Sequence, residues 1–191
     1  MDVNTKEQIN ASKFNTKQMT LIGLMTAIIC IIAPFSLNLP ISPVPISLGT
    51  LAIYFVISVL GMKGGTISVL IYILLGLAGL PVFTNFSGGA AKLFGPTGGY
   101  IIGYIFLSLI CGFFIDKFKN NIPLCFLGIV LGTVVFYLFG TVWLSYQASL
   151  TFPAALAAGV LPFIPFDLIK LVLAMLLGNQ VRRRISRAGG Y

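Results

Sequence analysis

The sequence predicts an all-α integral membrane protein with six transmembrane helices, and both its composition and its charge spacing support this. Of its 191 residues, 58% are hydrophobic and 8% are charged, whereas soluble domains carry about a quarter charged residues. Charged residues are absent from four long stretches, 18–62, 64–91, 93–115 and 120–166. Since a helix needs ~20 apolar residues to cross a bilayer of ~30 Å, each stretch holds one or two crossings.

Fitting helices to these stretches gives six crossings in a single membrane domain, residues 1–191. The first crossing is too long for a cleavable signal peptide and lacks a small-residue cleavage pattern. The second and third are short enough to be tilted or re-entrant. A tail of residues 1–19 precedes the bundle of about 20–179, and a basic tail, 180–191, follows it. The crossings are predicted at about Thr20–Ser36, Ile46–Gly61, Thr66–Val82, Gly99–Ile115, Ile122–Leu144 and Leu161–Asn179.

The basic residues predict the orientation. If six helices alternate, ten of the twelve basic residues fall on one side, Lys92 alone falls on the other, and Lys170 is intramembrane. Positive residues stay cytoplasmic, so we expect both termini in the cytoplasm. Orientation and contact with anionic lipid head groups explain the net charge of +8, which gives no support to nucleic-acid binding. The ten residues are Lys6, Lys13, Lys17, Lys63, Lys117, Lys119, Arg182, Arg183, Arg184 and Arg187.

Several groups that enzymes use are missing from the sequence. The chain has no histidine, which removes the commonest metal ligand and general base. Its three cysteines lack metal-ligand spacing, and no Gly-x-x-x-x-Gly-Lys-Ser/Thr motif is present to bind ATP. Asp116 lies beside Lys117 at a helix end, where a solvated cluster is the simplest interpretation. We therefore predict no catalytic site, no metal site and no cofactor, and an intramembrane enzyme is the least favoured class.

The most informative feature is Asp167 and Lys170, which lie three residues apart in the otherwise uncharged apolar stretch 164–177. Residues at i and i+3 share one face of a helix, so the two side chains project together. A charge near the hydrocarbon core is costly unless it is compensated. Three interpretations are open: the pair grips a polar ligand, it relays protons or ions, or the two charges only neutralise each other. With a rise of ~1.5 Å per residue, Asp167 lies ~9 Å below a helix start near Leu161, in the outer half of the membrane.

Two outer loops are expected above this pair. The first, residues 38–46, contains three prolines, which make it extended and stiff, so it is either a lid or a plain connector. The second, residues 81–100, contains five glycines, which permit close approach to a ligand. In this loop Thr97 is placed to cap the next helix and to leave the amides of Gly98 and Gly99 as an anion or carbonyl site. A tight turn is the alternative.

Two of the predicted helices carry small residues four positions apart. Gly23 and Ala27 lie in the first helix, and Gly128 and Gly132 lie in the fifth. Small residues at this spacing let a second helix approach closely. We favour packing within the chain over contact with a partner protein.

Four segments of the chain, taken in order, are similar to segments of a known protein family. They are Pro43-Val-Pro-Ile-Ser-Leu-Gly-Thr50, Leu77-Ala-Gly-Leu-Pro-Val-Phe83, Gly95-Pro-Thr-Gly-Gly-Tyr100 and Leu161-Pro-Phe-Ile-Pro-Phe-Asp-Leu-Ile-Lys170. They closely resemble the BioY family, the biotin-specific substrate-binding (S) components of energy-coupling factor (ECF) transporters. The resemblance runs from about Leu21 to Leu177.

The resemblance implies a six-helix protein of the prokaryotic plasma membrane that captures biotin with high affinity from outside. It also implies a separate transmembrane coupling (T) component and two ABC ATPase subunits that supply the energy, which agrees with the missing ATP-binding loop. In the family the first helix often carries an Ala-x-x-x-Ala-like face for the T component. Here Gly23 and Ala27 occupy that face and Ile31 follows, so the docking face departs from the family pattern.

Carried over by position, the resemblance implies that Asp167 accepts hydrogen bonds from the ureido N–H groups of biotin and that Lys170 attracts a ligand oxygen, with the carboxylate as one candidate. Lys92 is the alternative partner for the carboxylate, and the resemblance does not decide between the two. A second function stays open, a stand-alone secondary carrier for a small organic acid in which Asp167 cycles protons. The further candidates for ligand contact are Asn85, Thr97, Gly98, Gly99 and Tyr100.

Overall fold

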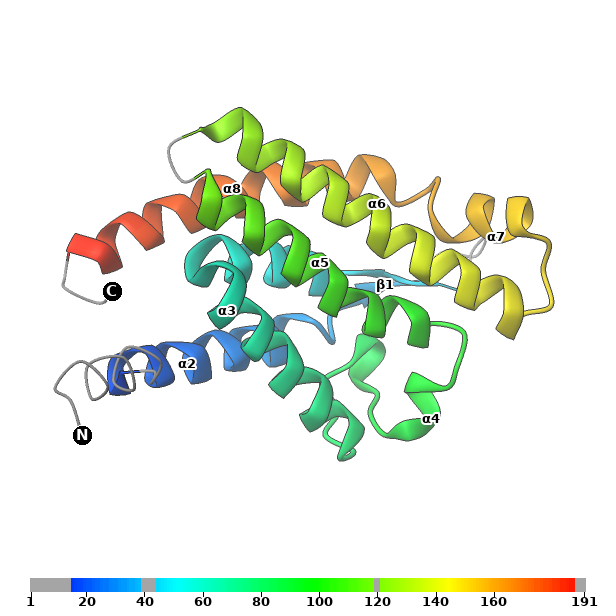
Figure 1. Ribbon diagram of the computed structural model, residues 1–191. Coiled ribbons are helices and arrows are strands. Elements are labelled where there is room, and N and C mark those ends of the chain that lie inside the picture. The colour runs from blue at the N-terminus through cyan, green and yellow to red at the C-terminus, as the bar shows by residue number, and fades with distance from the viewer. Residues whose placement is uncertain (1–14, 39–43, 119–120, 188–191) are drawn as a thin grey trace, which may run out of the picture.

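The computed structural model describes residues 15–38, 44–118 and 121–187, and it is mostly helical (Figure 1). Four of its helices are long and apolar enough to cross a membrane. The first helix, α2 (Thr16–Ile32), is apolar but has only 17 residues. The prediction of an apolar helical chain is therefore confirmed, while the count of six crossings stays a prediction. The four long helices are α3 (Gly49–Leu77), α5 (Gly98–Lys117), α6 (Ile122–Gln147) and α8 (Ile164–Arg187).

A single residue, Gly61, breaks α3 into two helical segments, 49–60 and 62–77. Its φ of 72° and ψ of −160° lie in a region that is open essentially only to glycine. A Cβ added at Gly61 would also lie 2.2 Å from Oδ1 of Asp116. The two segments correspond to the second and third expected crossings. The sequence therefore located both stretches but missed that one residue, rather than a loop, joins them.

The short elements of the structure lie at one end of the bundle, and the sequence predicted none of them. Two strands pair antiparallel, with Ser36 opposite Ser47 and Leu37 opposite Ile46. This pairing draws the end of α2 towards the start of α3. The proline-rich loop expected as a lid or connector falls largely on residues 39–43, which lie outside the described residues. The short elements are β1 (Ser36–Leu37), β2 (Ile46–Ser47), η1 (Thr84–Phe86), α4 (Ala90–Leu93) and α7 (Phe152–Gly159).

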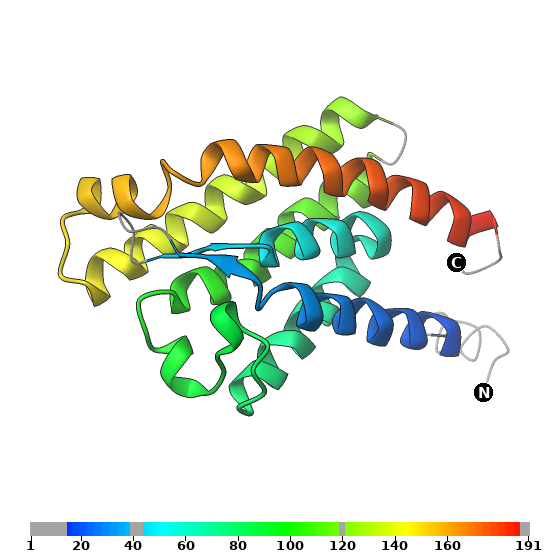
Figure 2. The same ribbon diagram turned by 180° about the vertical axis from the view of Figure 1, so that it is seen from behind.

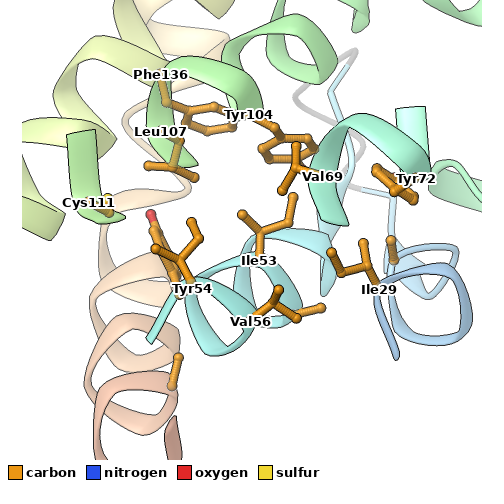
Figure 3. Close-up of a cluster of buried hydrophobic side chains, with 14 of the residues drawn as sticks. Ile29, Ile53, Tyr54, Val56, Val69, Tyr72, Tyr104, Leu107, Cys111 and Phe136 are labelled. Atoms are coloured by element: carbon orange, nitrogen blue, oxygen red, sulfur yellow. The ribbon is translucent and has the colours of Figure 1, made fainter. Parts of the chain in front are cut away.

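Helix α3 is central to the packing, because α2, α5 and α8 all contact it, while α6 packs on α5 and α7. Buried side chains from α2, α3, α5 and α6 meet in one core (Figure 3). The small residues of α6 face this bundle: a Cβ at Gly128 would collide with Phe114, and one at Gly132 with Cys111. The prediction that this pair of glycines packs within the chain is confirmed. The same prediction for Gly23 and Ala27 of α2 is wrong, because both residues are exposed and no described atom lies within 4 Å of a Cβ added at Gly23.

The two ends of the bundle differ in charge. The start of α2, the end of α5, the start of α6 and the end of α8 lie together at one end, and α4 and α7 lie at the other (Figures 1 and 2). Among the described basic residues, only Lys92 and Lys170 lie away from the first end. The predicted separation of charge therefore matches the fold, although Lys6, Lys13 and Lys119 lie outside the described residues. The basic residues of this end are Lys17, Lys63, Lys117, Arg182, Arg183, Arg184 and Arg187.

Asp116 has a structural role at the basic end. Its Oδ2 accepts a hydrogen bond of 2.8 Å from the backbone N–H of Met62, directly after the break in α3. Its Oδ1 forms an ion pair of 2.7 Å with Nη2 of Arg182. The carboxylate thus satisfies one of the unpaired amides at the start of a helical segment and ties α3, α5 and α8 together. Asp116 is partly solvated, as expected, with its side chain 39% exposed, but the prediction missed its contacts with Met62 and Arg182.

Candidate ligand-binding site

Asp167 lies in the first turn of α8, because this helix begins at Ile164 rather than near Leu161. Three residues at ~1.5 Å each place it about 4.5 Å from the helix start, not ~9 Å. A carboxylate in the first turn is favoured by the partial positive charge of the helix N-terminus. Its backbone N–H donates to the carbonyl of Phe163 at 2.8 Å, which fixes the turn. The predicted depth of Asp167 below the helix start was therefore too large. Asp167 does lie at the end of the bundle opposite the basic residues, as predicted.

The predicted pairing of Asp167 with Lys170 is confirmed. Nζ of Lys170 lies 2.9 Å from Oδ1 of Asp167, and both residues are buried. The hydroxyl of Thr50 donates to the same oxygen at 3.1 Å. The hydroxyl of Tyr137 donates to Oδ2 at 2.6 Å. Side chains from α3, α6 and α8 therefore converge on one carboxylate.

The hydrogen-bonding capacity of this pair is nearly used up. The ammonium of Lys170 has three N–H donors, and three acceptors lie near it: the Ser47 carbonyl at 2.7 Å, Oγ1 of Thr50 at 3.2 Å and Oδ1 of Asp167 at 2.9 Å. The carboxylate of Asp167 offers about four acceptor positions, of which Lys170, Thr50 and Tyr137 take three. Among the described residues no fourth donor is found, so one position remains, on Oδ2. A ligand oxygen reaches Lys170 only by displacing one of its present partners.

A polar cavity of about 50 Å³ lies next to this network. Its polar lining comes from Asp167, Lys170 and hydroxyl-bearing side chains, and its apolar lining comes largely from aromatic rings. The rings of Tyr104 and Phe136 are stacked with centroids 5.1 Å apart. Polar groups set among apolar rings are typical of small-molecule sites, but such sites usually measure roughly 300–1,000 Å³. The cavity is therefore smaller than such sites. The lining residues are Val44, Pro45, Ser47, Thr50, Thr84, Thr97, Tyr100, Ile101, Tyr104, Phe136, Tyr137, Gly159, Phe163, Asp167 and Lys170.

Comparison with known proteins assigns the chain to a family. The profile of the BioY family matches residues 5–187. The chain belongs to the BioY family. Biotin transporter BioY2 of Lactococcus lactis subsp. cremoris is 34% identical to it over 179 residues, covering 93% of this chain and 97% of that relative. Biotin transporter BioY of Thermotoga maritima is 38% identical over 167 residues, with 87% and 96% covered.

A solved structure agrees with the assignment to the BioY family. The crystal structure of the S-component for biotin from an ECF-type ABC transporter superposes with a TM-score of 0.81 at 34% sequence identity. The match covers 96% of this chain and 95% of that one. The similarity therefore extends over the whole bundle and is not confined to a single motif.

The cavity of this BioY family chain is also lined by two further residues for which the sequence predicted a contact with the ligand. Thr97 and Tyr100 both face it, and the Tyr100 hydroxyl donates to the Gly159 carbonyl at 3.0 Å. The expected cap is not formed: Thr97 stands at the N-cap of α5, but its side chain makes no capping hydrogen bond. The backbone N–H of Gly98 donates to the Gly95 carbonyl at 3.0 Å, so this amide is already engaged.

The other four predicted contacts lie outside the cavity lining. Gly98 and Gly99 are buried, and their missing side chains leave room for the Leu93 carbonyl and the Trp143 side chain, respectively. Asn85 is exposed and joins η1 to β1 through a hydrogen bond of 2.7 Å from Ser36. Lys92 lies on α4, where partial burial lowers the pKa of its ammonium group. Their contact with a ligand stays a prediction.

Sequence reasoning missed three members of the network, Ser47, Thr50 and Tyr137. A signal for Tyr137 was present: Thr133, Tyr137 and Thr141 recur every four residues in an otherwise apolar helix. Residues at this spacing share one helix face. No such signal marked Ser47, because it contributes a backbone carbonyl, an atom that every residue carries.

Proposed function

We propose that this chain is the biotin-specific S-component of an ECF-type transporter, a membrane subunit that captures biotin from outside with high affinity. It is a transport protein of the BioY family and not an enzyme. The observation that carries the site is the buried Asp167–Lys170 network beside an aromatic cavity. A T component and two ABC ATPases supply the energy for uptake, in keeping with the S-component to which the chain is similar. No cofactor is needed for this role.

Calorimetry on the purified chain tests the proposal directly. We expect tight binding of biotin to the wild type and a loss of about 100-fold or more in Asp167→Asn, since the amide has only one acceptor oxygen and its NH₂ group turns two N–H donors towards groups that themselves donate. Asp116→Asn is the matched control, because it makes the same change at the basic end, away from the cavity. Affinity in the micromolar range or weaker for the wild type, or equal affinity in the two variants, would sink the assignment.

In the proposed complex, the last acceptor position on Asp167 receives a ureido N–H of biotin. A second ureido contact with Asp167 requires the hydrogen bond from Thr50 to break. A contact with Lys170 requires the bond to Ser47 or Thr50 to break, and in both cases the small cavity has to widen. Asn85, Thr97, Gly98, Gly99 and Tyr100 remain candidates for further contacts.

The cation that holds the biotin carboxylate is either Lys170 or Lys92, and one experiment separates them. Affinities of Lys170→Met and Lys92→Met are measured for biotin and for biotinamide, which lacks the carboxylate charge. Replacing the lysine that binds the biotin carboxylate is expected to weaken the binding of biotin and to leave the binding of biotinamide unchanged. Equal losses for both ligands in Lys170→Met would assign Lys170 to the network instead.

The proposed face for the T component is Gly23 and Ala27 on α2, both of which are exposed. No atom of the described residues would lie within 4 Å of a Cβ added at Gly23, so they leave this surface open. Ala27→Leu is expected to abolish co-purification with the T component while leaving biotin affinity unchanged. Ala157→Leu, at an exposed position of α7, is the matched control. Normal assembly of Ala27→Leu would exclude this face.

The proposed orientation is a single membrane domain of six crossings, with both termini in the cytoplasm of a prokaryotic cell. It is supported by the basic residues gathered at one end of the bundle. Single cysteines at Lys92 and Lys117, in a background without the natural cysteines, test it by labelling intact cells with an impermeant thiol reagent. Only the first position is expected to react. The stand-alone carrier is not favoured by the family assignment; uptake by cells expressing this chain alone that follows the proton gradient would revive it.

A further inference from the structure

A second cavity, apolar and about 310 Å³ in volume, lies between α6, α7 and α8. It exists because α6 packs on α5 and α7, whereas α8 packs on α3, so the facing sides of α6 and α8 are left apart. Most of its described lining residues are aliphatic; the exceptions are Thr133, Tyr137, Thr141 and Asp167, of which Asp167 alone is charged. We name it the lateral groove. The aliphatic lining residues are Val130, Val134, Leu138, Leu156, Val160, Ile164, Leu168 and Leu171.

The lateral groove opens on the outer surface of the bundle. Val134 is 48% exposed, Leu138 is 49% exposed and Leu168 is 46% exposed. All three lie on helices that are long and apolar enough to cross a membrane. In a bilayer these positions face hydrocarbon, and an empty apolar groove loses the dispersion contacts of its walls. In a membrane, the mouth of the lateral groove is therefore expected to face lipid acyl chains.

The length of the lateral groove fits one leaflet. Its lining on α6 runs from Val130 to Thr141, and 11 residues at ~1.5 Å each span about 16 Å. Half of a hydrocarbon core of ~30 Å is about 15 Å. Among the described residues, no basic side chain lines the groove. Its polar groups are few: the hydroxyls of Thr133 and Tyr137 already donate hydrogen bonds, and the Thr141 hydroxyl is buried without a hydrogen-bond partner in the described part of the chain. The lining thus suits a hydrocarbon chain and holds no cation for a phosphate or a carboxylate.

We propose that the lateral groove binds one acyl chain of an outer-leaflet phospholipid, and that this chain forms one wall of the ligand site. Of the residues that the structure describes, Asp167 and Tyr137 alone line both the groove and the polar cavity. An acyl chain behind them keeps water from their hydrogen bond of 2.6 Å, and such a bond is stronger where the local dielectric is low. The link to biotin affinity, and the assignment to the outer leaflet, rest on the proposed function and orientation.

Lipid retention tests the site without biotin. Val134→Phe fills the groove, and Val142→Phe makes the same change at a position of α6 that is 59% exposed and does not line it. After exchange into detergent with dioleoylphosphatidylcholine, native mass spectrometry is expected to find one retained phospholipid in the wild type and in Val142→Phe, and none in Val134→Phe. Leu168→Phe fills the groove from α8 and is likewise expected to retain no phospholipid, so it replaces Val134→Phe in the test if that variant does not fold. Equal retention in all four proteins would overturn the proposal.

Biotin affinity then tests the coupling. The wild type and Val142→Phe are expected to bind biotin several-fold more tightly when the phospholipid is added back, while Val134→Phe does not respond to it. Displacement of the retained lipid by biotin would assign the groove to the ligand and overturn the lipid site. Absence of any biotin binding, with lipid retention as expected, would instead refute the proposed function and leave the lipid site standing.

Discussion

The two ends of α8 each carry an ion pair, and the two pairs are built differently. At the ligand-site end, Lys170 and Asp167 are 2.9 Å apart, and their side chains are 10% and 6% exposed. At the basic end, Arg182 and Asp116 are 2.7 Å apart, and their side chains are 19% and 39% exposed. The first pair joins neighbours on one helix, and the second joins residues 66 positions apart. Similar distances therefore do not imply similar energies, because burial decides what remains when one partner is lost.

The largest effect on stability is expected from Lys170→Met. It leaves the carboxylate of Asp167 buried without its cation, and breaking a buried pair in this way costs about 3–5 kcal/mol. Thermal unfolding in detergent measures the loss. In the double variant Asp167→Leu/Lys170→Met, which has no buried charge, most of the stability is expected to return. If the double variant is less stable than Lys170→Met, the pair itself, rather than the uncompensated charge, stabilises the fold.

At the basic end, the break in α3 is expected to matter more than the ion pair beside it. Gly61→Ala forces a side chain into backbone angles that suit glycine and against the Asp116 carboxylate, at a cost of about 3 kcal/mol. Gly23→Ala is the control, since nothing lies near the added Cβ and alanine favours a helix. The two melting temperatures are expected to move in opposite directions. An unchanged melting temperature in Gly61→Ala would mean that the break is not strained.

This contrast also explains how much the sequence could predict. The apolar stretches and the spacing of Asp167 and Lys170 report local properties, and the pairing of these two residues followed from helix geometry alone. The partners Thr50 and Tyr137 come from other helices, so no local pattern places them beside Asp167. Gly61 was visible in the sequence, but the Asp116 carboxylate that packs against its positive-φ backbone lies 55 positions later. Long-range contacts are thus what separates the expected site from the observed one.

An intermediate effect is expected from Tyr137→Phe at the ligand-site end. The change removes one hydrogen bond to a charged acceptor, the Oδ2 atom of Asp167, and such bonds contribute about 1.5–3 kcal/mol. Because the lost donor frees an acceptor position next to the cavity, we expect stability to fall while biotin binding persists. Thermal unfolding and calorimetry on the same sample separate the two outcomes. Tyr146→Phe, at an exposed position of α6, is the matched control.

The smallest effect is expected from Arg182→Gln, and it completes the comparison. The partner Asp116 is 39% exposed, and pairs of this kind contribute about 0–1 kcal/mol, with screening by salt. After the substitution the carboxylate still accepts the Met62 N–H, so the break in α3 keeps its cap. Arg183→Gln, one position along and exposed, controls for the loss of a positive charge. Unfolding at low and high salt is expected to show a difference between the two variants that shrinks as salt rises. A loss as large as that of Lys170→Met would mean that the basic end behaves as a buried pair, and burial would then no longer account for the difference between the two ends of α8.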